Sequence, residues 1–157
     1  MIRAAALGLI ALAACGDEDA LVRASQIQGD AIPEPLSSTP GDAALGQAIF
    51  VEREAGHCVL CHVVASLDAP FQGDVGPDLS DVGARLTPGQ IRLRLVDASR
   101  LNPDTVMPPY YRLHGLQQVA HGLEGETVLS SEEIEHLVAY LAALKGPAGD
   151  DSGDTPN

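Results

Sequence analysis

The feature that most constrains how this chain can fold is a short segment with two cysteines and a histidine, Cys58-Val59-Leu60-Cys61-His62. Two thiols separated by two residues can bind a metal ion, form a redox-active pair, or bond covalently to a porphyrin ring. Each chemistry requires the segment to face its metal, partner or cofactor. The fold must therefore be built around this segment, and the rest of the sequence decides between the three chemistries.

Cys15 is the one other cysteine in the sequence. A structural zinc site would need a second pair of ligands. A redox-active pair would not require His62 and belongs with a strand-helix pattern that the chain lacks. Haem c attachment uses the whole motif, because Cys58 and Cys61 add to the vinyl groups and His62 then lies beneath the ring at the iron. The motif therefore predicts one covalently attached haem c, with His62 as an axial ligand.

The second axial ligand is predicted to be Met107. Apart from Met1 it is the only methionine in the sequence, and it lies in a proline-rich segment, 102–110. A methionine in a packed core more usually lies on a helix or strand among apolar neighbours. A stiff loop that presents a single thioether is instead typical of an axial ligand opposite His62.

The other histidines are alternative ligands. His114 and His121 are expected in loops, and either could take the sixth position. His57 is too close to Cys58 to reach the opposite face of the ring, and His136 is expected to face solvent on a helix. With protein ligands on both sides, the iron has no free position for a substrate, so the site predicts electron transfer and not catalysis at iron.

The first residues, 1–14, predict an export signal, because a single basic residue precedes an apolar run that contains no acid. The run is too short to span a bilayer, which needs about 20 apolar residues. The segment Leu12-Ala13-Ala14-Cys15 resembles the lipobox of bacterial lipoproteins. We therefore expect a periplasmic protein anchored to the membrane by a lipid on Cys15. Ordinary signal cleavage, which would leave Cys15 without a role, is the alternative.

Composition divides the rest of the chain into three parts. Residues 15–40 are rich in proline and serine and predict a flexible tether. Residues 41–146 have the length and apolar content of one domain, and the acidic tail over 147–157 is expected to be disordered. The formal net charge is −13, which argues against nucleic acid as a partner because phosphates would be repelled.

The domain is predicted to be all-α, since no segment offers a convincing strand. Helices are expected to begin at Thr39-Pro40-Gly41-Asp42, Thr87-Pro88-Gly89-Gln90 and Ser130-Ser131-Glu132-Glu133. In the first, Pro40 is expected in the first turn and the helix is expected to run to about Glu54. The other two begin with capping boxes, in which the first and fourth residues satisfy each other's backbone amides.

Several positions resemble the class I cytochromes c. Gly46 and Phe50 in the first helix and Tyr140 in the last are spaced as in that family. The resemblance implies a class I cytochrome c fold, in which the terminal helices cross over the covalently attached haem and aromatic rings pack at the crossing. Pro77 resembles the proline whose carbonyl accepts a hydrogen bond from the axial histidine, here His62.

A longer resemblance, over residues 41–146, is to the SoxX family of small monohaem subunits. It is carried by the runs Phe71-Gln72-Gly73-Asp74, Gly76-Pro77-Asp78-Leu79, Val82-Gly83-Ala84-Arg85, Leu95-Val96-Asp97-Ala98-Ser99-Arg100-Leu101-Asn102-Pro103-Asp104-Thr105 and Met107-Pro108-Pro109-Tyr110-Tyr111-Arg112.

The resemblance implies a non-catalytic subunit of an L-cysteine S-thiosulfotransferase. Such a subunit forms a heterodimer with a SoxA-like cytochrome, accepts electrons while SoxA couples thiosulfate to the SoxY carrier cysteine, and passes them to a soluble cytochrome c. A free-standing monohaem carrier to an oxidase or reductase is the alternative. A haem enzyme or gas sensor with Met107 displaced is a third.

Arginines are concentrated between the two expected axial ligands. Arg85, Arg100 or Arg112 is expected to face the haem propionates or the partner subunit, because a guanidinium binds carboxylates with two parallel hydrogen bonds. Arg92 and Arg94 are expected on a solvated helix face.

Overall fold

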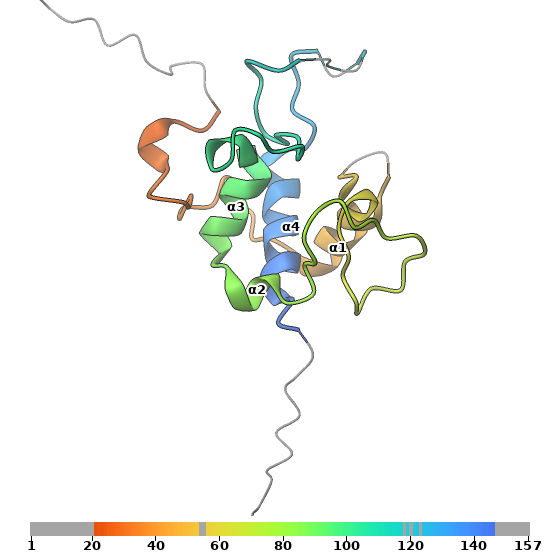
Figure 1. Cartoon of the computed structure of the whole chain (residues 1–157). Helices are drawn as coiled ribbons and strands as arrows, with labels where there is room; N and C mark the ends of the chain where they lie inside the picture. Colours follow the sequence, from red (N-terminus) through yellow and green to blue (C-terminus); the bar gives the residue numbers. More distant parts are fainter. Residues whose placement is uncertain (1–20, 54–55, 118, 120, 123, 147–157) are drawn as a thin grey trace, which may run out of the picture.

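A computed structural model describes residues 21–53, 56–117, 119, 121–122 and 124–146 of the chain (Figure 1). In chain order, the helices are η1 (Ala24–Gln26), α1 (Ala43–Val51), η2 (Cys58–Leu60), α2 (Val82–Arg85), α3 (Pro88–Asp97), η3 (Ala98–Arg100) and α4 (Ser131–Ala143). The described residues form no strand beyond one isolated bridge between Gln28 and Ala31. The all-α prediction is confirmed. The expected export signal, Cys15 and the tail over 147–157 lie outside the described residues.

The first helix begins at a different residue from the one we expected. Asp42 is the N-cap of α1, because its carboxylate accepts hydrogen bonds from the backbone amides of Ala44 at 2.7 Å and Leu45 at 3.2 Å. Pro40 therefore lies before the helix and not in its first turn. The helix also ends earlier than predicted, at Val51, because the backbone turns to an extended conformation at Glu52.

Both predicted capping boxes are present. The Thr87 hydroxyl accepts from the Gln90 amide at 3.3 Å, and the Gln90 side chain accepts from the Thr87 amide at 2.9 Å. Ser130 and Glu133 make the same reciprocal pair, at 3.2 and 2.8 Å. These contacts satisfy backbone donors that would otherwise lack partners at the starts of α3 and α4.

The last helix, α4, runs through the middle of the domain, and α1, α2 and α3 all pack against it (Figure 1). Its buried face includes the predicted apolar stripe, Ile134, Leu137, Val138 and Leu141. No helix in the described part of the chain is long and apolar enough to cross a membrane.

The contact between α1 and α4 brings the two helix backbones close together. A β-carbon on Gly46 would lie 2.0 Å from the carbonyl oxygen of His136 and 2.8 Å from the Tyr140 β-carbon. Glycine is therefore required at this position. Beside it, the rings of Phe50 and Tyr140 pack in a tilted arrangement, with centroids 5.6 Å apart and an interplanar angle of 59°, which is favourable for an aromatic pair.

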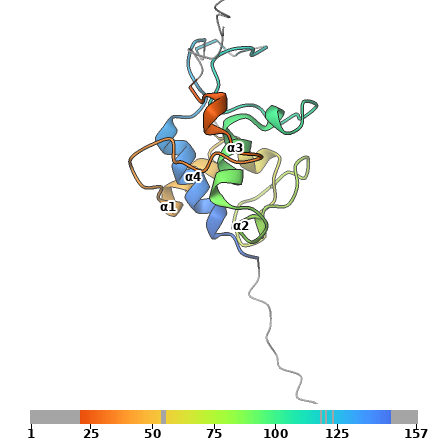
Figure 2. The same ribbon diagram turned by 90° about the vertical axis from the view of Figure 1, so that its left-hand side faces the viewer.

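Residues 21–40, which we expected to be part of a flexible tether, pack against the domain in the structure. Figure 2 shows this segment running along α3 before the chain reaches α1. Ile32 is 0% exposed, and with Val22 it forms a second apolar cluster against Leu93 and Val96 of α3. The segment is anchored because these isolated apolar side chains find a partner surface on α3, a contact that a proline- and serine-rich composition does not reveal.

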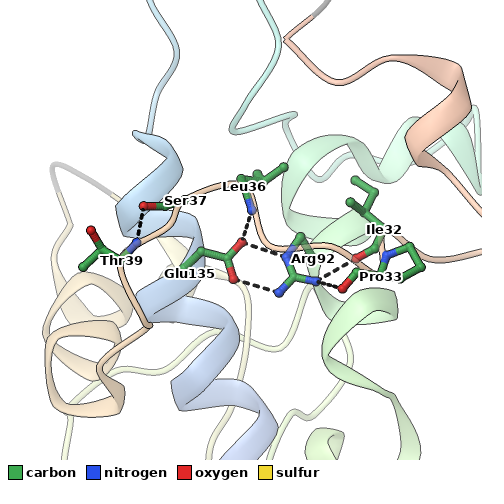
Figure 3. Close-up of polar contacts among 7 residues, drawn as sticks. All are labelled: Ile32, Pro33, Leu36, Ser37, Thr39, Arg92 and Glu135. Carbon is green, nitrogen blue, oxygen red and sulfur yellow. Dashed lines mark hydrogen bonds and ion pairs between the residues drawn. The ribbon is translucent and has the colours of Figure 1, made fainter.

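A buried ion pair joins this segment to α3 and α4 (Figure 3). Arg92 donates from Nε and Nη2 to the two carboxylate oxygens of Glu135, both at 2.7 Å. Its Nη1 donates to the carbonyls of Ile32 at 2.7 Å and Pro33 at 3.2 Å, and the Leu36 amide donates to Glu135 at 2.9 Å. Arg92 is only 4% exposed, so our expectation of a solvated arginine there was wrong.

Candidate functional site

A cavity of about 800 Å³ opens beside the cysteine motif, within the usual size range for cofactor sites. Helix α3 contributes Ile91 and Leu95, α1 contributes Phe50 and α4 contributes Leu141. The predicted ligand residues all line this cavity: Cys58, Cys61, His62 and Met107. The fold thus brings together side chains that lie far apart in the sequence, in a largely apolar wall.

The cysteine motif adopts a tight helical turn. His57, just before it, has a left-handed backbone with φ of 57°, and η2 follows over Cys58–Leu60. The amides of Cys61 and His62 both donate to the Cys58 carbonyl, at 3.0 and 2.9 Å. Because a 3₁₀ helix has about three residues per turn, Cys58 and Cys61 lie on the same side of the segment, facing the cavity.

The two thiols differ in their surroundings. Cys58 is 7% exposed and Cys61 is half-buried. Burial raises the pKa of the Cys58 thiol to about 12, and its Sγ donates to the Gly56 carbonyl at 3.4 Å. Redox-active cysteines have lowered pKa values. The raised pKa of Cys58 therefore disagrees with the redox-pair interpretation.

His62 is held in one tautomer by the loop that follows the motif. Its Nδ1 lies 2.8 Å from the carbonyl oxygen of Pro77. A carbonyl can only accept, so Nδ1 carries the proton and Nε2 keeps a free lone pair for a metal. A β-carbon on Gly76 would lie 2.3 Å from Cε1 of the ring, so the loop can approach His62 only with glycine there. This geometry agrees with the orienting role implied for Pro77.

Met107 is half-buried, packs against the main apolar core and lines the cavity. Its backbone amide donates to the Thr105 hydroxyl at 3.2 Å, a local turn that stiffens the loop. Ligation by Met107 stays a prediction. The structure places it on the wall of the same cavity as His62.

The alternative histidines lie differently. His57 lines the cavity but is adjacent to Cys58, as expected. His114 and His121 are not among the lining residues, and His121 pairs with Glu124 at 3.6 Å. His136 is half-buried and faces solvent only in part, because its Nδ1 accepts from the Asp42 amide at 2.9 Å in the contact between α1 and α4.

The arginines divide into two groups. Arg85 and Arg94 line the cavity. Arg85 contacts Asp81 at 2.7 Å, and Arg94, which we had expected on a solvated helix face, lies 3.6 Å from Asp30. Each guanidinium already has an aspartate beside it, and its remaining N–H groups are of the kind that binds the carboxylates of a cofactor.

The other group faces a buried carboxylate. Arg112 lies 2.9 Å and Arg100 lies 3.7 Å from Asp97, and none of the three lines the cavity. Of the arginines expected to face the propionates, only Arg85 is therefore in a position to do so. Sequence reasoning passed over Asp97. A signal was present, because this acidic residue lies between the apolar Val96 and Ala98 and has several arginines close by in the sequence.

Tyr110, which the sequence left open as either haem packing or a partner-facing residue, belongs to the cavity wall. It is 4% exposed, lines the cavity and interacts with Cys58. Burial raises the pKa of its hydroxyl well above the usual value, so Tyr110 contributes a neutral ring to the wall.

The cavity fits a covalently attached haem. Two thiols on one side of a short helix, an imidazole with Nε2 free and a thioether all line one apolar space. Sulfur and nitrogen donors of this kind are the ligand set that c-type haem uses, and the two arginines match its carboxylates.

Among solved structures, the chain is similar to a chain in a crystal structure of SoxXA from P. pantotrophus, with 31% identity and a TM-score of 0.68 over 74% of this chain and 90% of that one. The c-type cytochrome SorU from Sinorhizobium meliloti is 28% identical over 66% of this chain and 91% of that one, with a TM-score of 0.43. No protein-family model and no curated protein matches the chain. The chain belongs to the class I c-type cytochromes, which transfer electrons through a covalently bound haem c.

Proposed function

We propose that the chain is a monohaem, SoxX-like electron-transfer subunit. In this role it accepts electrons while a SoxA-like partner couples thiosulfate to the SoxY carrier cysteine. The observation that carries the proposal is the meeting of Cys58, Cys61, His62 and Met107 at one cavity. The likeness to a chain of SoxXA supports the choice of partner.

The residues at the cavity have separate tasks. Cys58 and Cys61 would hold the haem by thioether bonds, and His62 and Met107 would bind its iron. Pro77 keeps the Nδ1 proton of His62 in a hydrogen bond, which leaves Nε2 free and would make it a stronger ligand. When bound, the haem supplies a one-electron couple. A thioether opposite an imidazole raises the reduction potential relative to two imidazoles, which suits an electron acceptor.

The distribution of cysteines supports a redox subunit whose partner holds the sulfur chemistry. Joining thiosulfate to a cysteine thiol forms one sulfur–sulfur bond and releases one proton and two electrons. Cys58 and Cys61 are committed to haem, and Cys15 lies at the expected signal. The reacting cysteine and the thiosulfate site are therefore assigned to the partner proteins. A single haem takes the two electrons one at a time, passing each to a soluble cytochrome c.

We also propose that the protein acts in the periplasm and is anchored there by a lipid on Cys15. The support is the sequence alone, namely the apolar run over 1–14 and the lipobox-like residues before Cys15. An anchor of this kind would keep the cytochrome domain close to the membrane.

The first test is the absorption spectrum of the purified holoprotein, oxidised and reduced. We expect a low-spin haem with the weak near-infrared band of a thioether bound to ferric iron. A spectrum of two imidazoles would assign His114 or His121 instead of Met107, and a high-spin spectrum would contradict the electron-transfer proposal.

The second test is isolation of the tagged protein from cells that express it from its native locus. We expect a stable stoichiometric complex with a larger c-type cytochrome. If the protein is isolated as a monomer and thiosulfate oxidation is normal when it is deleted, the free-standing carrier is the better interpretation.

A further inference from the structure

The loop that carries Met107 leaves α3 and returns to the same end of it. On its return, the Tyr110 amide donates to the Leu95 carbonyl at 3.2 Å, and the Tyr111 amide donates to the Val96 carbonyl at 3.3 Å. The loop is thus closed at its neck by the last turn of α3. The position of Met107 depends on how firmly that neck is held.

A buried carboxylate lies at this neck. Asp97, the last residue of α3, is only 3% exposed. It accepts from Arg112 Nη1 at 2.9 Å and from both the amide and the hydroxyl of Ser99. Arg112 Nη1 also donates to the Ser99 hydroxyl at 3.2 Å. The Asp97–Arg112 pair, which we call the clasp, therefore joins the residue before the loop to a residue just after it.

Within the loop, by contrast, the hydrogen bonds are local. The Thr105 amide donates to the Asn102 carbonyl and the Asp104 amide to the Asn102 side chain, both at 3.1 Å. The Met107 amide donates to the Thr105 hydroxyl. The loop is also tied to η3 at its start, where the Leu101 and Asn102 amides donate to the Ala98 carbonyl at 3.0 and 3.1 Å. The hydrogen bonds found among the described residues 103–109 stay within the loop, so η3, the neck and the apolar packing of Met107 hold it in place.

We propose that Asp97 and Arg112 are positioning residues that keep the Met107 thioether at the sixth axial position of the haem. The inference rests on the function proposed above. A buried, charge-assisted pair at the neck shortens the part of the loop that is free to move. A shorter loop gains less conformational entropy when Met107 leaves the iron, so release of the ligand is less favourable. Without the clasp the Met107 ligand should leave the iron more often, although neither clasp residue touches the cavity.

The test compares Arg112→Gln and Asp97→Asn with Glu135→Gln in the holoprotein. Glu135→Gln is a matched control, because it neutralises the other buried carboxylate paired with an arginine, on a different face of α3. The readouts are the near-infrared thioether band, the rate of carbon monoxide binding to reduced protein, and hydrogen exchange at the Tyr110 and Tyr111 amides.

We expect both clasp variants to lose intensity in the thioether band and to bind carbon monoxide at least about tenfold faster, the factor that corresponds to losing one charge-assisted hydrogen bond. Their Tyr110 and Tyr111 amides should exchange faster than in the wild type. Glu135→Gln should lower the melting temperature and leave all three readouts unchanged. If one clasp variant does not fold, the other decides the test.

Three outcomes overturn the inference. An unchanged band and carbon monoxide rate in the clasp variants would show a merely structural pair and would leave the proposed function intact. Equal effects in Glu135→Gln would show that general loss of stability is the cause. Absence of the thioether band in the wild type would remove the Met107 assignment itself, and with it both this inference and the ligand set of the proposed function.

Discussion

Replacing Arg92 by methionine removes the side chain that joins the N-terminal segment, α3 and α4. The substitution deletes two hydrogen bonds of 2.7 Å to Glu135 and the contacts with the carbonyls of Ile32 and Pro33. Glu135, whose side chain is 6% exposed, would keep only the Leu36 amide as a donor. A carboxylate left unpaired at this depth should be strongly destabilising.

The expected loss of unfolding free energy is about 3–5 kcal/mol, the cost measured when one partner of a buried ion pair is removed. For a domain of this size the loss corresponds to a fall in melting temperature of about 12–25 °C. Urea unfolding of the holoprotein, followed by far-ultraviolet circular dichroism, measures it directly. Hydrogen exchange should also show residues 32–36 opening before α4 does.

The double variant Arg92→Met with Glu135→Leu separates two costs. One is the burial of an unpaired carboxylate, and the other is the loss of the hydrogen bonds that hold the N-terminal segment. Removing the unpaired carboxylate should recover part of the stability, because apolar replacements of buried ion pairs are often well tolerated. Recovery should stay incomplete, since the Ile32 carbonyl and the Leu36 amide still lack their partners. If Arg92→Met alone lowers the unfolding free energy by less than about 1 kcal/mol, the ion pair does not behave as a buried one. A loss of that size is expected of a solvent-exposed ion pair.

Three other predictions follow from the site and the helix contact. Met107→Ala should open the iron to carbon monoxide, lower the reduction potential and slow turnover of the complex; an unchanged potential, measured by redox titration, would refute the ligand assignment. Gly46→Ala should cost about 3 kcal/mol on urea unfolding, since the new β-carbon would lie 2.0 Å from the His136 carbonyl oxygen, and a loss within experimental error would mean that α1 can move away from α4. Cys15→Ala should release the protein from the membrane fraction into the soluble periplasm, and mass spectrometry of the wild type should show a lipid on Cys15; an unmodified mature protein would contradict the anchor.

The features that sequence predicted well are those that depend on residues close together in the chain. The predicted capping boxes at Thr87 and Ser130 were confirmed, because a capping box satisfies backbone amides at the start of its own helix and needs no distant residue. The cysteine motif indicated haem because attachment needs two thiols and a histidine at a short, fixed spacing. The spacing of Gly46 within α1 likewise indicated a close helix contact, although the partner atoms on α4 came only from the structure.

The features that sequence missed depend on which surfaces meet. Residues 21–40 look like a linker by composition, yet Ile32 is buried on α3 because the fold offers it an apolar surface. Arg92 and Arg94 lie two residues apart on one helix, but the first is buried against Glu135 and the second lines the cavity.

The sequence by itself thus indicated covalent haem c, because the motif holds two thiols and a candidate iron ligand within five adjacent positions. It also predicted Met107 as the second ligand, since no other methionine lies in the domain. The tertiary structure decided how that chemistry is held. It placed Asp97 and Arg112 at the neck of the Met107 loop and closed the N-terminal segment over α3. Both depend on the burial of charged and apolar groups, which is a property of packed surfaces and not of local spacing.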